Sequence, residues 1–349
     1  MKQTLNKNES GLASIVIAIL IVIILSSMVF GFSQIINREQ RQSLDKQLSS
    51  QAFYAAESAI NDATKAISEQ NFIVDKTDCA PYPSGGGPAA LSGNSNKLTG
   101  DGNVKYTCLL IDQKPSTLEY KSVRTDHAVA FPVAAADGSA ISSVSFSWRS
   151  TEKGYDQFRG SSDRAFSTSG SWNSTGLLRV DIVSVGAGNF DRTNLENGAK
   201  TFYLYPNAGG DGVTPTTIPY GSESGAIVNG ACGPASSGDA AKCNVQITGL
   251  PGVKSYVRLI SVYNPVSVSI KATNSAGVPV NDLKDAQTDV DATGMAGDVV
   301  RRINVRIPRQ STDLPDFAIA SMDSLCKKFL VRPDRVYDNS SVPECSINR

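Results

Sequence analysis

The six cysteines are the residues of this chain with the most defined chemistry. All of them follow a long apolar run, at positions Cys79, Cys108, Cys232, Cys243, Cys326 and Cys345. An even number of cysteines on one side of an apolar segment is typical of disulfides formed outside the cytoplasm. We expect the three sequential pairs: Cys79 with Cys108, Cys232 with Cys243, and Cys326 with Cys345. The alternative is a set of free thiols, since cysteine is also a common core residue.

No residue pattern predicts an enzyme or a metal centre. His127 is the only histidine, and the cysteines lack the close Cys-x-x-Cys spacing of structural zinc sites. An exported hydrolase is a third functional hypothesis, but the chain has no Gly-x-Ser-x-Gly elbow, no second histidine and no close acidic pair in a supporting context. We therefore predict that the chain is not an enzyme and needs no cofactor and no metal.

Three polar stretches resemble ligand loops only in part. Residues 289–294 read Asp-x-Asp-x-Thr-Gly like the start of a calcium loop, but Val300 stands where the bidentate glutamate belongs, so we predict a turn. Residues 189–196 form a weaker cluster of oxygen ligands. Residues 209–212, Gly-Gly-Asp-Gly, lack the lysine and helix of a phosphate loop and predict a flexible loop.

The charge balance gives no sign of a nucleic-acid partner. The chain has 33 basic and 33 acidic residues, and charged residues make up only 19% of it. Nucleic-acid-binding proteins concentrate basic residues on one face or in one stripe, and no such cluster is found in the sequence. We expect partners of another kind.

The stretch from Gly11 to Asn71 predicts one continuous helix. Residues 12–32 carry no charge, and that length spans a hydrocarbon core of about 30 Å. No glycine occurs between Phe32 and Ser84, and the first proline is Pro81, so nothing ends the helix early. A secretory signal peptide would have a shorter apolar region and a small-x-small cleavage site. We expect residues 12–72 to form a membrane-spanning helix that continues as a spine.

The polar half of this helix carries an apolar stripe at three- and four-residue intervals. Such spacing places side chains on one face, which must pack against another surface. The candidate packing residues are Leu44, Leu48, Ala52, Ala55, Ala59, Ala63 and Ile67. The partner of the stripe is either the C-terminal region or a similar helix, or both.

The remainder predicts a large antiparallel β-rich domain, so the fold class is α+β. Residues 73–103 are rich in Gly, Pro and Ser and form a linker, residues 104–308 form the β domain, and residues 309–349 form a disulfide-closed tail with a short helix near 317–329. Residues 274–277 predict a turn. The expected strands are Val104–Ile111, Ile141–Trp148, Leu177–Val185, Thr201–Tyr205, Asn244–Thr248, Tyr256–Tyr263, Val266–Ala272 and Val299–Ile307.

Four aromatic residues flank the long segment between two of these strands. Trp148, Trp172, Tyr155 and Phe158 offer either an adhesive surface or core packing. Core packing is the prediction for Trp148, because this residue lies within an expected strand.

The N-terminal region resembles the type IV pilin signal. A short polar leader, residues 1–11, ends in Gly11 and precedes an apolar helix with an amphipathic continuation. The resemblance implies cleavage between Gly11 and Leu12 by a prepilin peptidase and methylation of the new N-terminus. Major pilins carry glutamate at the fifth mature position, where this chain has Val16. That difference, with the sequence Gln-Ala-Phe-Tyr-Ala-Ala-Glu-Ser-Ala at 51–59, resembles minor pilins of the PilX type and tip pseudopilins.

A looser resemblance covers residues 289–308, which are similar to a late strand of some large minor pilins. Together these resemblances imply a pilin-type fold whose β domain lies outside the cytoplasm. They imply other pilin subunits, the prepilin peptidase and the membrane as partners, along with a ligand on a surface or host cell. The expected role is filament initiation, tip capping or surface attachment. The alternative is a single-pass membrane-anchored surface protein that binds a ligand and never enters a filament.

Overall fold

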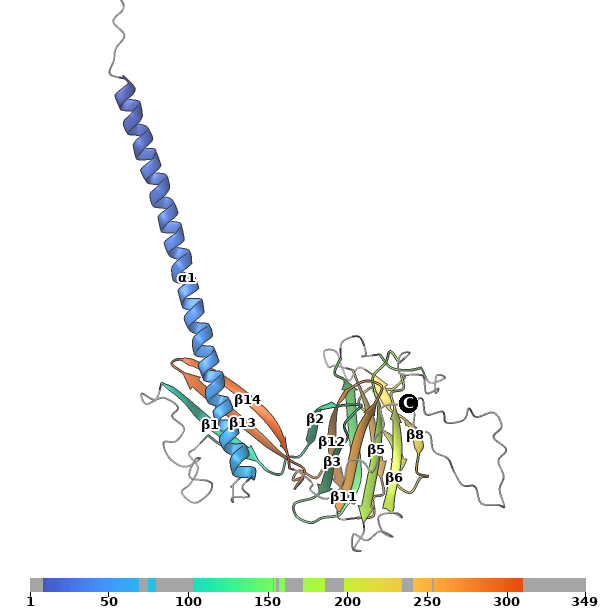
Figure 1. The fold of residues 1–349 in the computed structure, drawn as a ribbon. Helices are drawn as coiled ribbons and strands as arrows, with labels where there is room; N and C mark the ends of the chain where they lie inside the picture. The colour runs from blue at the N-terminus through green and yellow to red at the C-terminus, as the bar shows by residue number, and fades with distance from the viewer. Residues whose placement is uncertain are drawn as a thin grey trace, which may run out of the picture. The chain divides into compact units, whose positions relative to one another are not determined.

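The computed structural model describes residues 9–68, 75–79, 103–152, 154, 157–160, 172–185, 198–233, 241–252 and 254–309. These residues form one long helix and mostly antiparallel strands, so the fold class is α+β (Figure 1). The chain divides into two compact units. Unit 1 contains residues 1–113 and 287–307, and unit 2 contains residues 114–286 and 308–349.

Unit 1 is built on helix α1, which runs without a break from Glu9 to Ser68 (Figure 1). The helix begins before the expected Leu12, so Gly11 and Leu12 both lie within its first turn. Gly31 is the only glycine beyond that turn, and proline is absent, which explains the continuity. At 60 residues the helix is about 90 Å long, at a rise of 1.5 Å per residue.

The C-terminal half of α1 packs on a three-stranded antiparallel sheet. The strands are β1 (Val104–Asp112), β13 (Gln287–Ala296) and β14 (Val299–Pro308), in the order β1-β13-β14. Alanine dominates the helix side of this contact, and Val290 and Ala292 of β13 lie beneath it. The fully buried alanines of the helix are Ala52, Ala55, Ala56, Ala59 and Ala63.

The helix approaches β13 most closely at Gly294. A Cβ atom added to Gly294 would overlap the backbone of Ala52 and Ala56 and lie 2.9 Å from the Cβ of Ala55. No side chain fits between the two backbones at this point. Alanine on the helix and glycine on the strand therefore set the distance between the two elements.

Unit 2 is a sandwich of two sheets. The first sheet has the order β2-β12-β4-β10-β7, with β9 also paired to β10. The second sheet has the order β3-β11-β5-β6-β8, and all five of its strands are labelled in Figure 1. The pairing is antiparallel except between β7 and β10 and between β6 and β8. The strands are β2 (Leu118–Val123), β3 (Val129–Ala134), β4 (Ile141–Ser150), β5 (Leu177–Val185), β6 (Ala199–Tyr205), β7 (Thr216–Pro219), β8 (Ala226–Asn229), β9 (Ala231–Gly233), β10 (Lys242–Thr248), β11 (Lys254–Val262) and β12 (Val266–Asn274).

The inward side chains of both sheets form one hydrophobic core. Phe146 and Trp148 of β4 meet Phe131 of β3 and Phe202 of β6 in this core, and all four are almost completely buried. The rings of Tyr120 and Phe131 stack with centroids 4.9 Å apart, which joins β2 to β3. The alternation of buried and half-exposed residues along β11 and β12 is the pattern of strands with one face in a core.

Unit 2 is inserted between two strands that are neighbours in unit 1. β1 and β13 pair along their whole length, with Asp112 opposite Asp289, although unit 2 separates them in the sequence. The expected β-rich region 104–308 is therefore divided between the units, because its first and last strands pack under α1.

Each expected strand overlaps an observed one, but the prediction of a turn at 289–294 is wrong. These residues lie within β13, where Val290 and Ala292 alternate under the helix and turn Asp289 and Asp291 to the other face. The turn at 274–277 is present. The Oδ1 atom of Asn274 accepts hydrogen bonds from the backbone N–H groups of Ala276 and Val278, both at 3.0 Å.

Substitution of Gly294 by alanine tests the close approach. The added Cβ forces the helix from the sheet, and we expect unit 1 to lose about 1–3 kcal/mol of unfolding free energy. Both tryptophans lie in unit 2, so the urea midpoint measured by tryptophan fluorescence should stay unchanged. The midpoint measured by the circular dichroism of the helix should shift to a lower urea concentration. The control is Gly221→Ala, whose Cβ meets nothing within 4 Å. Equal shifts in both signals would contradict the prediction.

The half-buried carboxyl group of Asp62 should make the stability of unit 1 depend on pH. Burial raises the pKa of Asp62 above its ordinary 3.8, opposed by a 3.4 Å hydrogen bond from the Tyr106 hydroxyl and by Lys65. The folded unit therefore favours the protonated acid and loses stability as the pH rises through the folded pKa. We expect Asp62→Asn to stabilise unit 1 at neutral pH and to have no effect well below the unfolded pKa. Helix circular dichroism in urea at both pH values measures this, and a loss of stability at neutral pH would refute it.

Candidate functional site

The N-terminal half of α1 is the main candidate interaction surface. Every side chain from Ser14 to Lys46 is solvent-exposed, and the most apolar window of the helix has a mean hydropathy of 3.0 with no residue buried. Phe30 and Phe32 are 69% and 64% exposed. The helix is long and apolar enough to cross a membrane. An apolar surface of this size needs a cover, because soluble proteins rarely expose large contiguous apolar patches.

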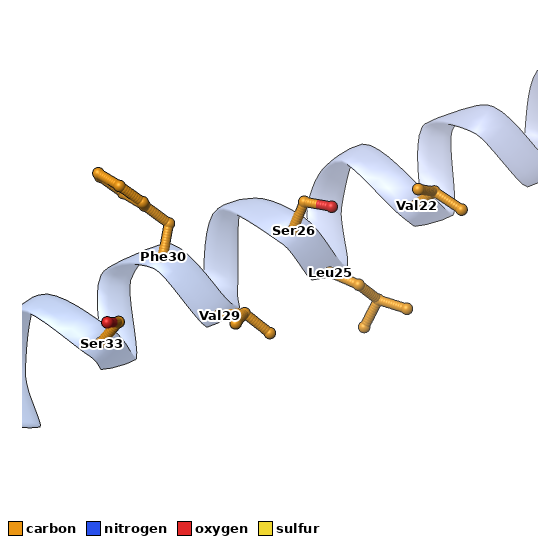
Figure 2. A pocket seen from close by; sticks show the side chains of 6 residues that line it. All are labelled: Val22, Leu25, Ser26, Val29, Phe30 and Ser33. Carbon is orange, nitrogen blue, oxygen red and sulfur yellow. The ribbon is translucent and has the colours of Figure 1, made fainter.

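A shallow groove runs along this surface. Figure 2 shows its lining residues, all of them from α1: Val22, Leu25, Ser26, Val29, Phe30 and Ser33. Small-molecule sites are concave and enclose most of their ligand, whereas this groove has walls from one helix only. The groove is therefore part of a helix surface suited to lipid or to another helix.

No charge interrupts the apolar surface. The sequence is uncharged from Leu12 to Asn37, and Arg38 is the first charged residue that follows. Val16 is 50% exposed on this surface, at the position where the pilin resemblance leads us to expect a glutamate. An isolated carboxylate at that place would be costly in an apolar environment, and Val16 avoids this cost.

The packing stripe of α1 contacts the sheet over a shorter length than expected, because its first residue lies beyond the end of the sheet. Ala52, Ala55, Ala59 and Ala63 are buried, and Leu48 and Ile67 are half-buried. Leu44 is 54% exposed. A Cβ added to Gly297, in the turn between β13 and β14, would lie 3.7 Å from Leu48, so the sheet ends under Leu48 and Leu44 lies beyond it. The buried residues Ala56, Ile60 and Ala66 were missed, although they fit the same helical spacing.

Two of the three expected disulfides are present. Cys79 is bonded to Cys108 and Cys232 to Cys243, while Cys326 and Cys345 lie outside the described residues, as does the expected helix at 317–329. Cys232 and Cys243 are buried opposite each other on β9 and β10. Both bonds fit a domain that folds in an oxidising compartment.

The Cys79–Cys108 bond belongs to a clasp, formed by residues 75–79, that lies against the end of β1. The backbone N–H of Lys76 donates to the carbonyl of Ile111 at 2.9 Å. The Oδ1 atom of Asp75 accepts from the backbone N–H of Gln113 at 3.0 Å and from its side-chain amide at 3.1 Å. The clasp therefore holds the point at which the chain leaves unit 1. The sequence predicted the disulfide that joins this linker to β1, but not the hydrogen bonds of Asp75 and Lys76.

The acidic residues of β13 pair with β14. Arg302 donates through Nε to Asp291 Oδ1 at 2.7 Å and through Nη2 to Oδ2 at 2.6 Å. Asp289 accepts from the Asn304 side chain at 2.7 Å and pairs with Arg306 at 3.1 Å. These carboxylates are cross-strand pairs, and no group of three or more metal-ligating side chains occurs among the described residues.

The other polar candidates carry no site in the described residues. The oxygen cluster at 189–196 lies outside them, and His127 is exposed. The loop at 209–212, expected to be flexible, is held by Asp211. Its Oδ1 atom accepts from the backbone N–H groups of Val213 at 2.8 Å and Thr214 at 2.7 Å. Gly212 accepts a further hydrogen bond from Asn244 at 2.6 Å.

Three of the four flanking aromatic residues lie in the described part of the chain, and these three pack inside unit 2 and form no exposed aromatic surface. Trp148 is in the core, as predicted, and Trp172 is 3% exposed. Tyr263 stacks on Trp172 with ring centroids 4.1 Å apart, and Arg159 lies 4.9 Å over the same ring. Phe158 packs against the core, and Tyr155 lies outside the described residues.

A comparison of the chain with protein-family models, with curated proteins and with solved structures finds no match in any of the three.

Proposed function

We propose that this chain is a non-catalytic structural subunit of a type IV pilus-like filament, a minor pilin or pseudopilin. The observation that carries the proposal is the division of α1 into two halves. Residues 14–46 are exposed and mainly apolar, and the C-terminal half is docked on its own sheet through alanines. One helix thereby joins an apolar environment to a folded domain.

The energetics of the exposed half support membrane residence first and helix packing afterwards. Each Val, Leu, Ile or Phe side chain removed from water contributes about 1.5–3 kcal/mol. A bilayer supplies that cover for an isolated subunit, and a bundle of similar apolar helices supplies it in a filament. The same surface thus serves as anchor and as assembly interface. The disulfides support a location of the β units outside the cytoplasm.

Val16 supports an accessory position at the filament tip. In the pilin family the glutamate at this position is thought to pair with the N-terminal amine of a neighbouring subunit. A subunit with Val16 leaves no unpaired carboxylate inside an apolar filament core. A tip subunit has no subunit above it, so this loss costs it little. Distribution along the shaft at the stoichiometry of a major subunit would contradict the tip position.

A second candidate function is that of a single-pass membrane-anchored surface protein that binds its ligand outside any filament. The insertion of a whole β sandwich between β1 and β13 favours a role in presenting that sandwich. Both candidates use α1 as the anchor, and they differ in the processing of the N-terminus.

Mass spectrometry of the mature N-terminus separates the two candidates. For a pilin-like subunit we expect a chain that begins at N-methylated Leu12, because the prepilin peptidase cuts after Gly11. Gly11→Val should block the cut by placing a branched side chain at the cleavage site, while Gly31→Val serves as a control outside it. An intact Met1 in the native protein, or a cut near Gly31, would exclude the filament proposal.

A charge at the centre of the apolar run tests the anchor itself. Val22→Arg places a cation at the middle of residues 12–32, which costs about 2.5–3.5 kcal/mol in membrane insertion. We expect a large part of the variant to move from the membrane fraction to the soluble or degraded fraction. The control, Gln40→Arg, adds the same charge next to Arg41 and should leave fractionation unchanged. Full membrane retention of the Val22→Arg variant would argue against the span.

A further inference from the structure

The outer face of the second sheet of unit 2 carries apolar side chains that are only partly covered. Alternate residues of its strands fill the sandwich core, so the residues between them point outward. Apolar sheet faces normally pack against another layer of the domain. The half-exposed or exposed apolar residues on this side, which we call the outer apolar face, are Tyr256 and Ile260 on β11, Val183 on β5, Tyr203 on β6 and Ile227 on β8.

Strand register places these side chains on one continuous surface. Tyr256 lies opposite Val183, and Tyr203 lies opposite Ile227. Near one end, Tyr203 packs against the cluster that contains Trp172, which bounds the face on that side. Ile227, on the last strand of the sheet, is 46% exposed. The face is therefore an apolar surface that extends across the sheet from β11 to β8.

Cations outnumber carboxylates on this side of the sheet. Arg179 and Arg258 both pair with Asp181, each at 3.0 Å, so two guanidinium groups share one carboxylate. The Nζ atom of Lys254 lies 5.1 Å from the centroid of the Tyr256 ring. Three cations beside one carboxylate favour an occupant that is acidic as well as apolar.

The C-terminal tail starts at the edge of the same sheet. The backbone N–H of Arg309 donates to the carbonyl of Ala286 at 2.9 Å. Two residues before Ala286, the backbone N–H of Lys284 donates to the carbonyl of Ala134 at 3.0 Å. Ala134 is on β3, opposite Lys254 of β11. The tail therefore begins close to the positively charged end of the face.

The first part of the tail has the composition that the face favours. Residues 310–326, which lie outside the described residues, contain the acidic residues Asp313, Asp316 and Asp323 and no lysine or arginine. The large apolar residues of the same stretch are Leu314, Phe317, Ile319, Met322 and Leu325.

The length of the tail also matches the width of the sheet. The helix that the sequence predicts near 317–329 would be about 20 Å long. Five strands at a spacing of about 4.8 Å span about 19 Å. The residues that join Arg309 to this helix reach about 24 Å when extended, which is enough to bring it over the face.

We propose that the C-terminal tail docks on the outer apolar face through residues 310–329 and forms a third layer of unit 2. Its apolar side chains cover Tyr256 and Ile260, and its aspartates face Lys254 and the arginines that share Asp181. The occupant of the face is thus a segment of the same chain, and the face is an internal contact of unit 2.

Hydrogen–deuterium exchange of the full-length protein in neutral detergent, measured by mass spectrometry, tests the docking. We expect peptides from residues 310–329 to exchange at least about tenfold more slowly than an unstructured chain. Ile260→Glu removes an apolar contact and adds a carboxylate that repels the aspartates of the tail. This variant should lose most of the protection in the tail.

The matched control is Val278→Glu, which changes an exposed valine in the turn after β12, on the first sheet. Protection of the tail should be the same in this variant as in the native protein. Tryptophan fluorescence verifies that unit 2 is folded in each variant, since both tryptophans lie in this unit.

A reciprocal variant tests the contact from the side of the tail. Met322→Asp weakens the apolar contact without changing the sheet, and it should increase the rate at which acetic anhydride modifies Lys254. The proposal is overturned if the native tail exchanges like an unstructured chain, or if Ile260→Glu protects the tail as well as Val278→Glu does. Protection that appears only as the protein concentration rises would assign the tail to a second copy and would also overturn it.

Discussion

The contact between the backbone of α1 and the backbone of β13 determines the structure of unit 1. Ala52 and Ala56 lie so close to Gly294 that no larger side chain fits between the helix and the strand. This contact fixes which turns of the helix belong to the folded unit and which extend beyond it. The sheet ends under Leu48, so the apolar residues before it have no partner within the described chain. The exposed apolar segment of α1 therefore begins where the close packing stops.

The two β assemblies use the alternation of strand side chains in different ways. In β13 one set of alternate residues packs under alanines, and the other set forms ion pairs with β14. In β4 one set fills the sandwich core, and the other consists of three serines and Arg149, which lie beside residues of β10 and β12. The first pattern joins a sheet to a helix. The second places polar side chains on the outer side of the sandwich.

The sequence was sufficient for the features that depend on local pattern. The absence of helix-breaking residues predicted α1, and β-branched runs predicted strands such as β5 and β12. It was insufficient where long-range packing decides. Asp289 and Asp291 looked like turn residues, because nothing local shows that Val290 and Ala292 lie under a helix more than two hundred residues earlier. The insertion of unit 2 between β1 and β13 and the clasp on Gln113 are likewise consequences of pairing at long range.

The clasp also has a mechanical consequence. Tension applied between unit 2 and the N-terminal end of α1 passes along the chain that joins Ser68 to Lys114, in addition to the packing of β13 on α1. The Cys79–Cys108 bond spans a sequence separation of 29, so the load bypasses residues 80–107. Those residues correspond to about 100 Å of fully extended chain, and the disulfide prevents this length from extending under load while the bond is intact. The hydrogen bonds of Asp75 and Lys76 place the restraint directly at the exit from β1. Under load, the disulfide therefore shortens the covalent connection between α1 and unit 2 by the length of the residues that it bypasses.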